Sequence, residues 1–378
     1  MQQSKAKSIG IVTAPGYTDH FGDLLTKELP DLLANAIDSE IRWDVEYLVD
    51  PLTGVTEDSE KIKKATYSEM KEKDWDIAIC LTDLPFFHNK SPIVMEMDRV
   101  NNIAWVSVPS LGIFPLKRRI ISFIMRILKD LTDPSYDSEE PISKESGKRK
   151  KLKSLSPFQR LEMEDKENGN GNVLYTYKPK IIGNTRLILG MLRANQPWVI
   201  FPHFLKIVVV AFTTGCFALV FPTMWKLSSH YNTGRMLLIT FLAIGLMVTW
   251  IILIHKLWEK PHKGRSKSLR IIYNVTTVFT LLLTVIFYYI ILYICFIFAS
   301  ITLIPSELLQ TEISGKVDLL RYLSIAWTAT SISTFIGAFG TTLENEEAVL
   351  STTYGNRQRQ RYEKVKKMKR KQEDDESS

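Results

Sequence analysis

Long apolar runs dominate the second half of the chain. They cover residues 204–225, 236–254, 271–304 and 319–340, and none of them has Asp, Glu, Lys or Arg in its central part. A helix needs about 20 apolar residues to cross the ~30 Å hydrocarbon core of a bilayer. The pattern therefore predicts an all-α, four-helix transmembrane domain over residues 204–340.

The first 131 residues instead alternate between strand-like and helix-like patterns. Strands are expected at residues 8–13, 41–49, 76–81 and 103–108, and helices at 24–36, 59–73 and 116–131. Residues 41–49 alternate apolar and polar side chains, as in an edge strand, whereas the continuous apolar run 76–81 is typical of a central parallel strand. Pro30 is expected to kink or divide the first helix. The order predicts a cytosolic α/β domain with a small parallel or mixed sheet.

Two further segments separate this domain from the membrane. Residues 132–180 are rich in Ser, Glu, Lys, Asn and Gly, a composition that predicts a disordered linker. Residues 181–203 include an amphipathic stretch that ends at Trp198, and we interpret them as an interfacial helix in the headgroup region. The basic amphipathic helix 116–131 has two interpretations, and packing on the sheet is favoured over a position on the membrane surface.

The net charge of +7 is unevenly distributed and indicates the orientation. Cytoplasmic loops collect Lys and Arg, the loop between the second and third runs is strongly basic, and the tail 341–378 carries a basic stretch over residues 357–371. We expect a multi-pass protein of the cell membrane with both termini in the cytoplasm and no secretory signal. The basic residues of that loop are expected to contact anionic lipid headgroups: Lys256, Lys260, Lys263, Arg265, Lys267 and Arg270. Nucleic-acid binding is not expected, because few aromatic residues accompany the basic ones.

The apolar runs carry few groups that suggest transport. Ionisable side chains at mid-membrane depth mark ion and proton paths, and their absence from these runs argues against a coupled transporter. Ala329, Ser333 and Gly337 have the four-residue spacing of close helix contacts. They predict packing either within the bundle or in a homo-oligomer through the fourth span.

Candidate ligand-binding residues follow the expected strands of the α/β domain. In open α/β sheets, ligands bind at the carboxyl ends of the strands. The polar residues in these loops are Tyr17, Thr18, Asp19, His20, Asp23, Thr82, Asp83, His88 and Ser110. The two Asp–His groupings could bind a divalent metal or form an acid/base pair, but helix capping, turn formation and simple exposure are favoured as the explanation. No metal ligand set is assigned, and the catalytic residues and cofactor are left open.

Cysteine usage and motif content add little chemistry. Cys80, Cys216 and Cys295 are widely spaced in apolar surroundings and are interpreted as small buried side chains, without a disulfide or zinc site. The chain has no Gly-x-Gly-x-x-Gly sequence after its first strand, no P-loop and no nucleophile elbow. An enzyme is therefore less favoured than a binding protein.

Two segments carry a resemblance. Residues 75–85 (WDIAICLTDLP) and 190–198 (GMLRANQPW), with the apolar runs after them, resemble a family of uncharacterised bacterial four-span membrane proteins, some of which carry the name methylenetetrahydrofolate dehydrogenase. Residues 88–94 (HNKSPIV) are similar to one cofactor-loop motif of that enzyme, although the rest of its dinucleotide signature and its catalytic Tyr and Lys are not evident. The resemblance implies a bacterial cytoplasmic membrane.

Three functions remain as hypotheses. The first is an integral membrane protein whose α/β domain binds a small ligand or a protein partner in a sensory, regulatory or scaffolding role. The second is a membrane-tethered oxidoreductase or hydrolase that uses Asp19, His20, Asp83 and His88. The third is an oligomeric transporter or channel with a pore along the Thr-rich face of the third run.

Overall fold

The chain forms two compact units. The computed structural model describes residues 6–54, 58–132, 158–163, 172–261, 267–313 and 317–340. The first unit holds the strands and the helices up to residue 194, and the second holds most of the apolar helices. The basic tail, most of the predicted linker, Lys263 and Arg265 lie outside the described residues.

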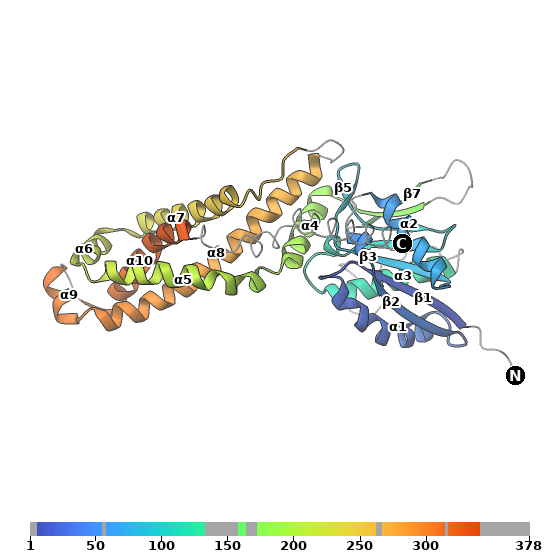
Figure 1. Ribbon diagram of the computed structural model, residues 1–378, viewed down its shortest axis with the longest axis horizontal. Coiled ribbons are helices and arrows are strands. Elements are labelled where there is room, and N and C mark those ends of the chain that lie inside the picture. The colour runs from blue at the N-terminus through green and yellow to red at the C-terminus, as the bar shows by residue number, and fades with distance from the viewer. Residues whose placement is uncertain are drawn as a thin grey trace, which may run out of the picture. The chain divides into compact units, whose positions relative to one another are not determined.

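A mixed sheet forms the centre of the first unit. Among the described residues it has eight strands in the order β2-β1-β3-β6-β5-β8-β7, with β4 paired to β5. Figure 1 labels five of these strands: β1, β2, β3, β5 and β7. The strands β2, β1, β3 and β6 are parallel, and the remaining pairs are antiparallel. The bounds are β1 Ala6–Thr13, β2 Arg42–Val49, β3 Ile77–Thr82, β4 Phe86–His88, β5 Ser91–Asp98, β6 Ile103–Ser107, β7 Phe158–Met163 and β8 Asn172–Tyr177. The α/β prediction with a mixed sheet is confirmed, and β2 lies at an edge.

Helices cover both faces of this sheet. The helix α2 (Ser59–Glu72) packs on one face, where Ile62 and Met70 join the core with Trp105 and Leu174. Successive strand residues point to opposite faces, so Tyr175, next to Leu174, lies on the other face of the sheet. The helix α3 (Leu116–Thr132) covers that face, where the guanidinium of Arg126 lies 4.9 Å from the Tyr175 ring. The helix α1 (Gly22–Ala36) contacts α3. The apolar face of α3 is buried, as expected for packing on the sheet.

Pro30 lies inside α1 without dividing it. Proline removes a backbone hydrogen bond and costs ~3 kcal/mol in a helix interior. Leu25, Leu29 and Leu33 are at most 1% exposed and hold both halves of the helix to the core. Burial of these leucines outweighs the defect.

The predicted disordered linker is wrong where the structure describes it. The strands β7 and β8 belong to the sheet, and residues 173–177 of β8 are buried. Asn172 donates a hydrogen bond of 3.3 Å to Glu96 of β5, whose carboxylate also contacts Lys63 at 3.0 Å. Composition averaged over a long polar segment concealed this short apolar strand, which pairing with β5 and β7 stabilises.

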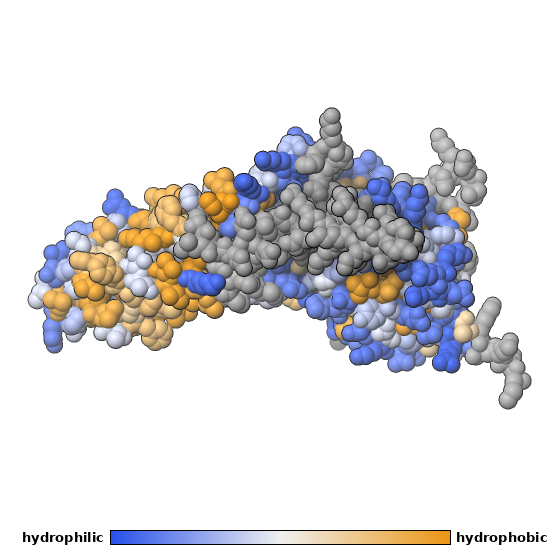
Figure 2. Space-filling model, in the orientation of Figure 1, coloured by the Kyte–Doolittle hydropathy of each residue, from blue (hydrophilic) through white to orange (hydrophobic). Residues whose placement is uncertain are grey.

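The second unit contains helices with the length and composition of membrane spans. Three of the described helices, α7, α8 and α10, are long and apolar enough to cross a membrane, or up to four if a bent pair counts as one span. Hydrophobic side chains cover much of the visible surface of these helices (Figure 2). The bounds are α5 Pro197–Leu219, α6 Pro222–His230, α7 Thr233–Ile254, α8 Lys267–Leu303, α9 Ser306–Glu312 and α10 Leu319–Gly340. At 37 residues, α8 is roughly 55 Å long and exceeds the hydrocarbon thickness.

The first predicted span is not one continuous helix. Its polypeptide bends by 92° between Leu219 and Pro222, because Pro222 cannot continue the helix and Phe221 is extended. Trp225 of α6 donates a hydrogen bond of 2.8 Å to the carbonyl of Leu219, which fixes the bend. Lys226 forms a 2.8 Å ion pair with Glu312, so α6 and α9 lie side by side (Figure 1).

Small side chains bring the helices of the bundle together. A Cβ at Gly215 of α5 would lie 2.1 Å from the Ser333 hydroxyl of α10, and one at Gly337 would lie 2.3 Å from the Tyr288 hydroxyl of α8. Ala329 is also buried. The predicted small-residue face therefore packs within this chain, and an oligomer through α10 would need another face of that helix.

The Thr-rich face of α8 is also internal. Thr276, Thr277, Thr280 and Thr284 are at most 4% exposed. Thr280 and Thr284 donate hydrogen bonds to carbonyls four residues earlier, a common use of threonine within helices. A pore formed between subunits along this face would require the bundle to open.

Candidate functional site at the carboxyl ends of the parallel strands

The parallel strands bring their polar end residues to one edge of the sheet. Thr82 of β3 pairs in register with Ser107 of β6, and Thr13 of β1 pairs with Leu81. Thr13, Thr82 and Ser107 are completely buried. This edge is where the sequence placed its candidate site.

Hydroxyl groups at this edge hold the loops in place. Thr82 donates a hydrogen bond of 2.9 Å to the carbonyl of Thr53, and Ser107 donates one of 2.8 Å to the carbonyl of Leu84. Ser110 donates to the Ser107 hydroxyl at 3.1 Å. Because these hydroxyls have protein partners, their first role is to shape the strand ends.

The predicted site residues divide into two groups. Five of them are buried at or after the strand ends: Tyr17, Thr18, Thr82, Asp83 and Ser110. The others are at least partly exposed: Asp19 and His20 on the 3-10 helix η1 (Asp19–Phe21), Asp23 on α1, and His88 at the end of β4. The Asp19–His20 pair, Asp83 and His88 lie on or after different elements, and no three His, Cys, Asp or Glu side chains among the described residues form a group suited to a metal ion.

His88 belongs to a tight hairpin. Asn89 and Lys90 have positive φ angles of 48° and 65° and connect β4 to the antiparallel strand β5. Two successive left-handed residues are the signature of a type I′ turn. The segment that resembled a cofactor loop is thus a β-hairpin, whose Asn89 carbonyl accepts a 2.8 Å hydrogen bond from Lys180.

The helix α4 (Lys180–Asn195) lies against the loops of this edge. A Cβ on Gly183 would lie 2.6 Å from the Tyr177 side chain, and one on Gly190 would lie 2.0 Å from the carbonyl oxygen of Pro109. Leu187 and Met191, on the same helical face, are completely buried. The part of the predicted interfacial helix that carries Leu187 and Met191 is therefore buried against the α/β domain, whereas Leu189 is 39% exposed.

Three arginines surround the loop that follows β6. This loop contains the 3-10 helix η3 (Val108–Leu111) and Gly112, whose φ of +83° favours glycine. Arg119 donates a hydrogen bond to the carbonyl of Leu111, and Arg193 donates one to the carbonyl of Ile113. The guanidinium of the third arginine, Arg186, lies 5.6 Å from the Tyr177 ring. We call Arg119, Arg186 and Arg193 the arginine cluster.

Among the described residues, no acidic side chain is paired with the arginine cluster. Burial, followed by the positive charge of Arg186, lowers the pKa of Arg119 below its usual value. In the part of the chain that the structure describes, no carboxylate forms a salt bridge with any of the three guanidiniums. Tyr177 donates a hydrogen bond to the carbonyl of Ser110 beside them, and burial raises the pKa of Tyr177. A partly buried set of like charges is chemically suited to an anionic ligand.

Tyr17 connects the loop after β1 to α4. Its hydroxyl is buried without a hydrogen-bond partner among the described residues. Burial raises the pKa of Tyr17 to about 12, and the nearby positive charge of Arg193 limits the rise. Arg193 of α4 therefore acts on the hydroxyl of a residue in the loop after β1.

Sequence reasoning missed the arginine cluster. Arg186 and Arg193 were part of the predicted interfacial helix, and Arg119 was part of the helix expected to cover the sheet. One signal was available: Gly183 and Gly190 are seven residues apart, as are Arg186 and Arg193, so each pair lies on one helical face. Of the three cysteines predicted to be buried, Cys80 is buried and burial raises the pKa of its thiol to about 12, whereas Cys216 and Cys295 are only partly buried.

Comparison of the chain with protein-family models, with curated proteins and with solved structures gives no match. The resemblance to bacterial four-span membrane proteins stays a prediction.

Proposed function

We propose that this chain is a membrane-anchored regulatory protein whose α/β domain binds a small anionic ligand at the arginine cluster. The observation that carries the proposal is the convergence of Arg119, Arg186 and Arg193 on one loop without a salt-bridging carboxylate among the described residues. Anions that bear phosphate or carboxylate groups match the geometry of guanidinium donors. The arginine cluster lies beside the carboxyl ends of the parallel strands, which is the edge where proteins of this fold class usually bind ligands.

The position of α4 provides a route from the ligand to the membrane helices. Two arginines of the cluster belong to α4, which ends at Asn195, and α5 begins at Pro197. Only Gln196 separates the two helices, and it has a left-handed conformation with φ 49° and ψ 61°. If α4 can take two positions, a ligand that binds one of them more tightly would shift the equilibrium toward that position. The short connection would pass this movement of α4 to α5.

The enzyme hypothesis receives less support from the geometry. Asp83 is 1% exposed, whereas His20 is exposed on η1 and His88 lies in a hairpin. General acid/base catalysis needs groups within hydrogen-bond reach of one reacting centre. The candidate acid and base residues of this chain are distributed over three separate loops.

The test uses the full-length protein in lipid nanodiscs. Thermal shift and hydrogen exchange of residues 180–195 would be measured with inorganic phosphate, pyrophosphate and ATP. At least one of these anions should raise the melting temperature and slow exchange in α4, and Arg186→Gln should remove both effects. Arg186 is the best position because its guanidinium contacts the Tyr177 ring, whereas those of Arg119 and Arg193 donate hydrogen bonds to backbone carbonyls and help to hold the loop. Arg42→Gln, an exposed charge on β2, is the matched control and should respond like the wild type.

Two outcomes would contradict the proposal. One is that none of the three anions changes melting or exchange, and the other is that Arg42→Gln and Arg186→Gln respond equally, which would indicate a general charge effect. Turnover in a hydrolase or oxidoreductase assay that is lost in Asp83→Asn or His88→Ala would favour the membrane-tethered enzyme.

A further inference from the structure

An apolar groove lies at the end of α7 within the second unit. It has a volume of about 530 Å³, and its walls come from the last turns of α7, the segment after that helix and one residue of α8. The apolar lining residues are Val248, Ile252, Leu253, Trp258 and Val278. Trp258 is 54% exposed and Leu253 is 67% exposed, so the groove opens onto the surface of the helices.

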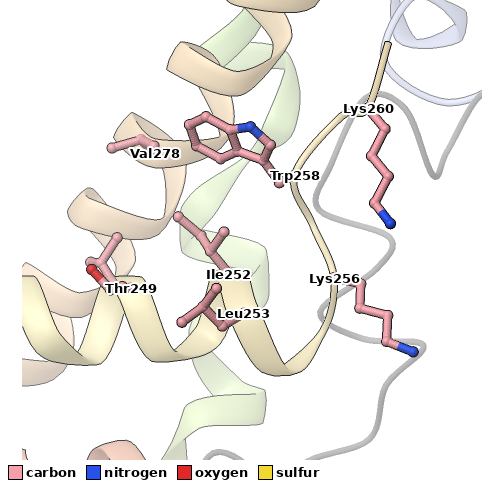
Figure 3. A pocket seen from close by; sticks show the side chains of 8 residues that line it. Thr249, Ile252, Leu253, Lys256, Trp258, Lys260 and Val278 are labelled. Atoms are coloured by element: carbon pink, nitrogen blue, oxygen red, sulfur yellow. The ribbon is translucent and has the colours of Figure 1, made fainter. Parts of the chain in front are cut away.

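Two lysines flank this apolar lining. Lys256 and Lys260 belong to the segment that follows α7, and both are exposed. Figure 3 shows Trp258, Ile252 and Leu253 together on one side of this segment, while the two lysine side chains extend away from them. The groove therefore combines a hydrophobic wall with two adjacent positive charges.

The backbone at Lys256 is unusual for a lysine. Its φ is +51°, and the chain closes α7 with hydrogen bonds from Lys256 to the carbonyl of Leu253 at 3.3 Å and from Leu257 to the carbonyl of Ile252 at 3.0 Å. This is a Schellman motif, in which glycine is the preferred residue at the left-handed position. A lysine here is less favourable for the backbone than glycine, which points to a use for its side chain.

We propose that this groove is a binding site for one anionic phospholipid. An acyl chain would lie against Val248, Ile252 and Val278, and the phosphate would lie near Lys256 and Lys260. Three features argue for a lipid. The walls belong to helices with the composition of membrane spans, Trp258 is of the residue type that favours the headgroup level, and lysines attract anionic headgroups. This inference goes beyond the anionic ligand of the α/β domain, because it concerns separate residues in the second unit.

The experiment measures which lipid stays bound to the full-length protein. Delipidated protein would be incubated with equal amounts of phosphatidylglycerol and phosphatidylcholine with identical acyl chains, and the bound lipid would be counted by native mass spectrometry. The wild type should retain phosphatidylglycerol preferentially. Removing one lysine should reduce this preference about fivefold, because that is the factor by which one lysine usually strengthens binding to an anionic surface. Glycerol phosphate, which has the headgroup charge but no acyl chain, should not compete.

The variants separate charge from packing. Lys256→Gly removes a charge and supplies the residue that the left-handed position prefers, so the protein should fold while its preference falls. Lys260→Gln should have a similar effect. Val278→Phe should fill the groove and lower retention of both lipids. Arg235→Gln, at the opposite end of α7, removes a charge outside the groove and should leave the preference unchanged.

The proposal is overturned by any of four results. The first is that the wild type retains the two lipids equally. The second is that Lys256→Gly and Lys260→Gln both match the wild type. The third is that Arg235→Gln lowers the preference for phosphatidylglycerol as much as these two lysine variants do. Competition by glycerol phosphate would indicate a site for free phosphate and would also overturn it.

Discussion

Gly190 of α4 lies directly against the carbonyl oxygen of Pro109, so that a Cβ at position 190 would be 2.0 Å from this oxygen. The contact joins residues far apart in the sequence and places α4 beside the loop that follows β6. Every larger residue would force the helix away from η3. The position of α4 on the α/β domain therefore depends on the absence of one side chain.

Gly190→Ala should destabilise the docked helix. Overpacking usually costs about 1–3 kcal/mol, which should exceed the gain of ~1 kcal/mol that alanine brings to a helix interior. We expect a lower melting temperature of the full-length protein and faster hydrogen exchange in residues 180–195. Gly245→Ala is the matched control because nothing lies within 4 Å of its added Cβ, and it should be neutral or stabilising. Unchanged exchange in Gly190→Ala would show that the contact does not hold α4.

Glu96→Gln should destabilise the sheet. The Glu96 carboxylate is 6% exposed and lies 3.0 Å from the Lys63 ammonium, which is 8% exposed. Breaking a buried pair leaves an uncompensated charge and costs about 3–5 kcal/mol. The lower end of this range is expected, since Glu60 also contacts Lys63.

The matched control for this ion pair is Glu28→Gln. Glu28 forms a 2.6 Å pair with Lys117, but the two side chains are 41% and 47% exposed. Exposed pairs contribute roughly 0–1 kcal/mol, so the change should be small. Chemical denaturation of the full-length protein measures both variants, and equal losses would contradict the role of burial.

Tyr17 should make stability fall at high pH. Its pKa is raised to about 12 in the folded protein, whereas an unfolded tyrosine titrates near ~10. Between these values the unfolded state releases its proton first, so the free energy of unfolding decreases as pH rises. Tyr17→Phe should reduce this slope in thermal melts between pH 10 and 12, with little change at pH 8. An unaltered slope would show that the Tyr17 hydroxyl does not titrate with unfolding.

The two ends of α7 should lie on opposite sides of the membrane. This helix has 22 residues and is therefore about 33 Å long, close to the hydrocarbon thickness. In a variant without native cysteines, an impermeant maleimide should label His230→Cys in intact cells and Lys260→Cys only after permeabilisation. Labelling of both positions in intact cells, or the reverse pattern, would contradict the orientation predicted from the loop charges.

Local patterns were sufficient for several elements of the fold. The alternation in residues 41–49 predicted the edge strand β2, and the continuous apolar run before Thr82 predicted the central strand β3, which is buried throughout. Both patterns reflect how many faces of a strand are covered. The strand β5, which contains Pro92, and β8, within a polar segment, were missed because their pairing partners stabilise them and local preference does not.

Part of the candidate site was also predictable. Buried Tyr17, Thr82 and Ser110 do lie at the carboxyl edge of the strands, because parallel strands must end on the same side. The arginine cluster was not predictable, since Arg119 belongs to α3 whereas Arg186 and Arg193 belong to α4.

The sequence by itself determined the α/β and apolar-helix halves of the chain, because hydrophobic periodicity depends on neighbouring residues only. The tertiary structure decided that α4 packs on the α/β domain, that the first apolar run bends at Pro222, and that Ala329, Ser333 and Gly337 pack within one chain. These outcomes depend on which distant surface buries a given face. An amphipathic helix shows which of its faces avoids water, but the fit of Gly190 against Pro109 selects the surface that covers it.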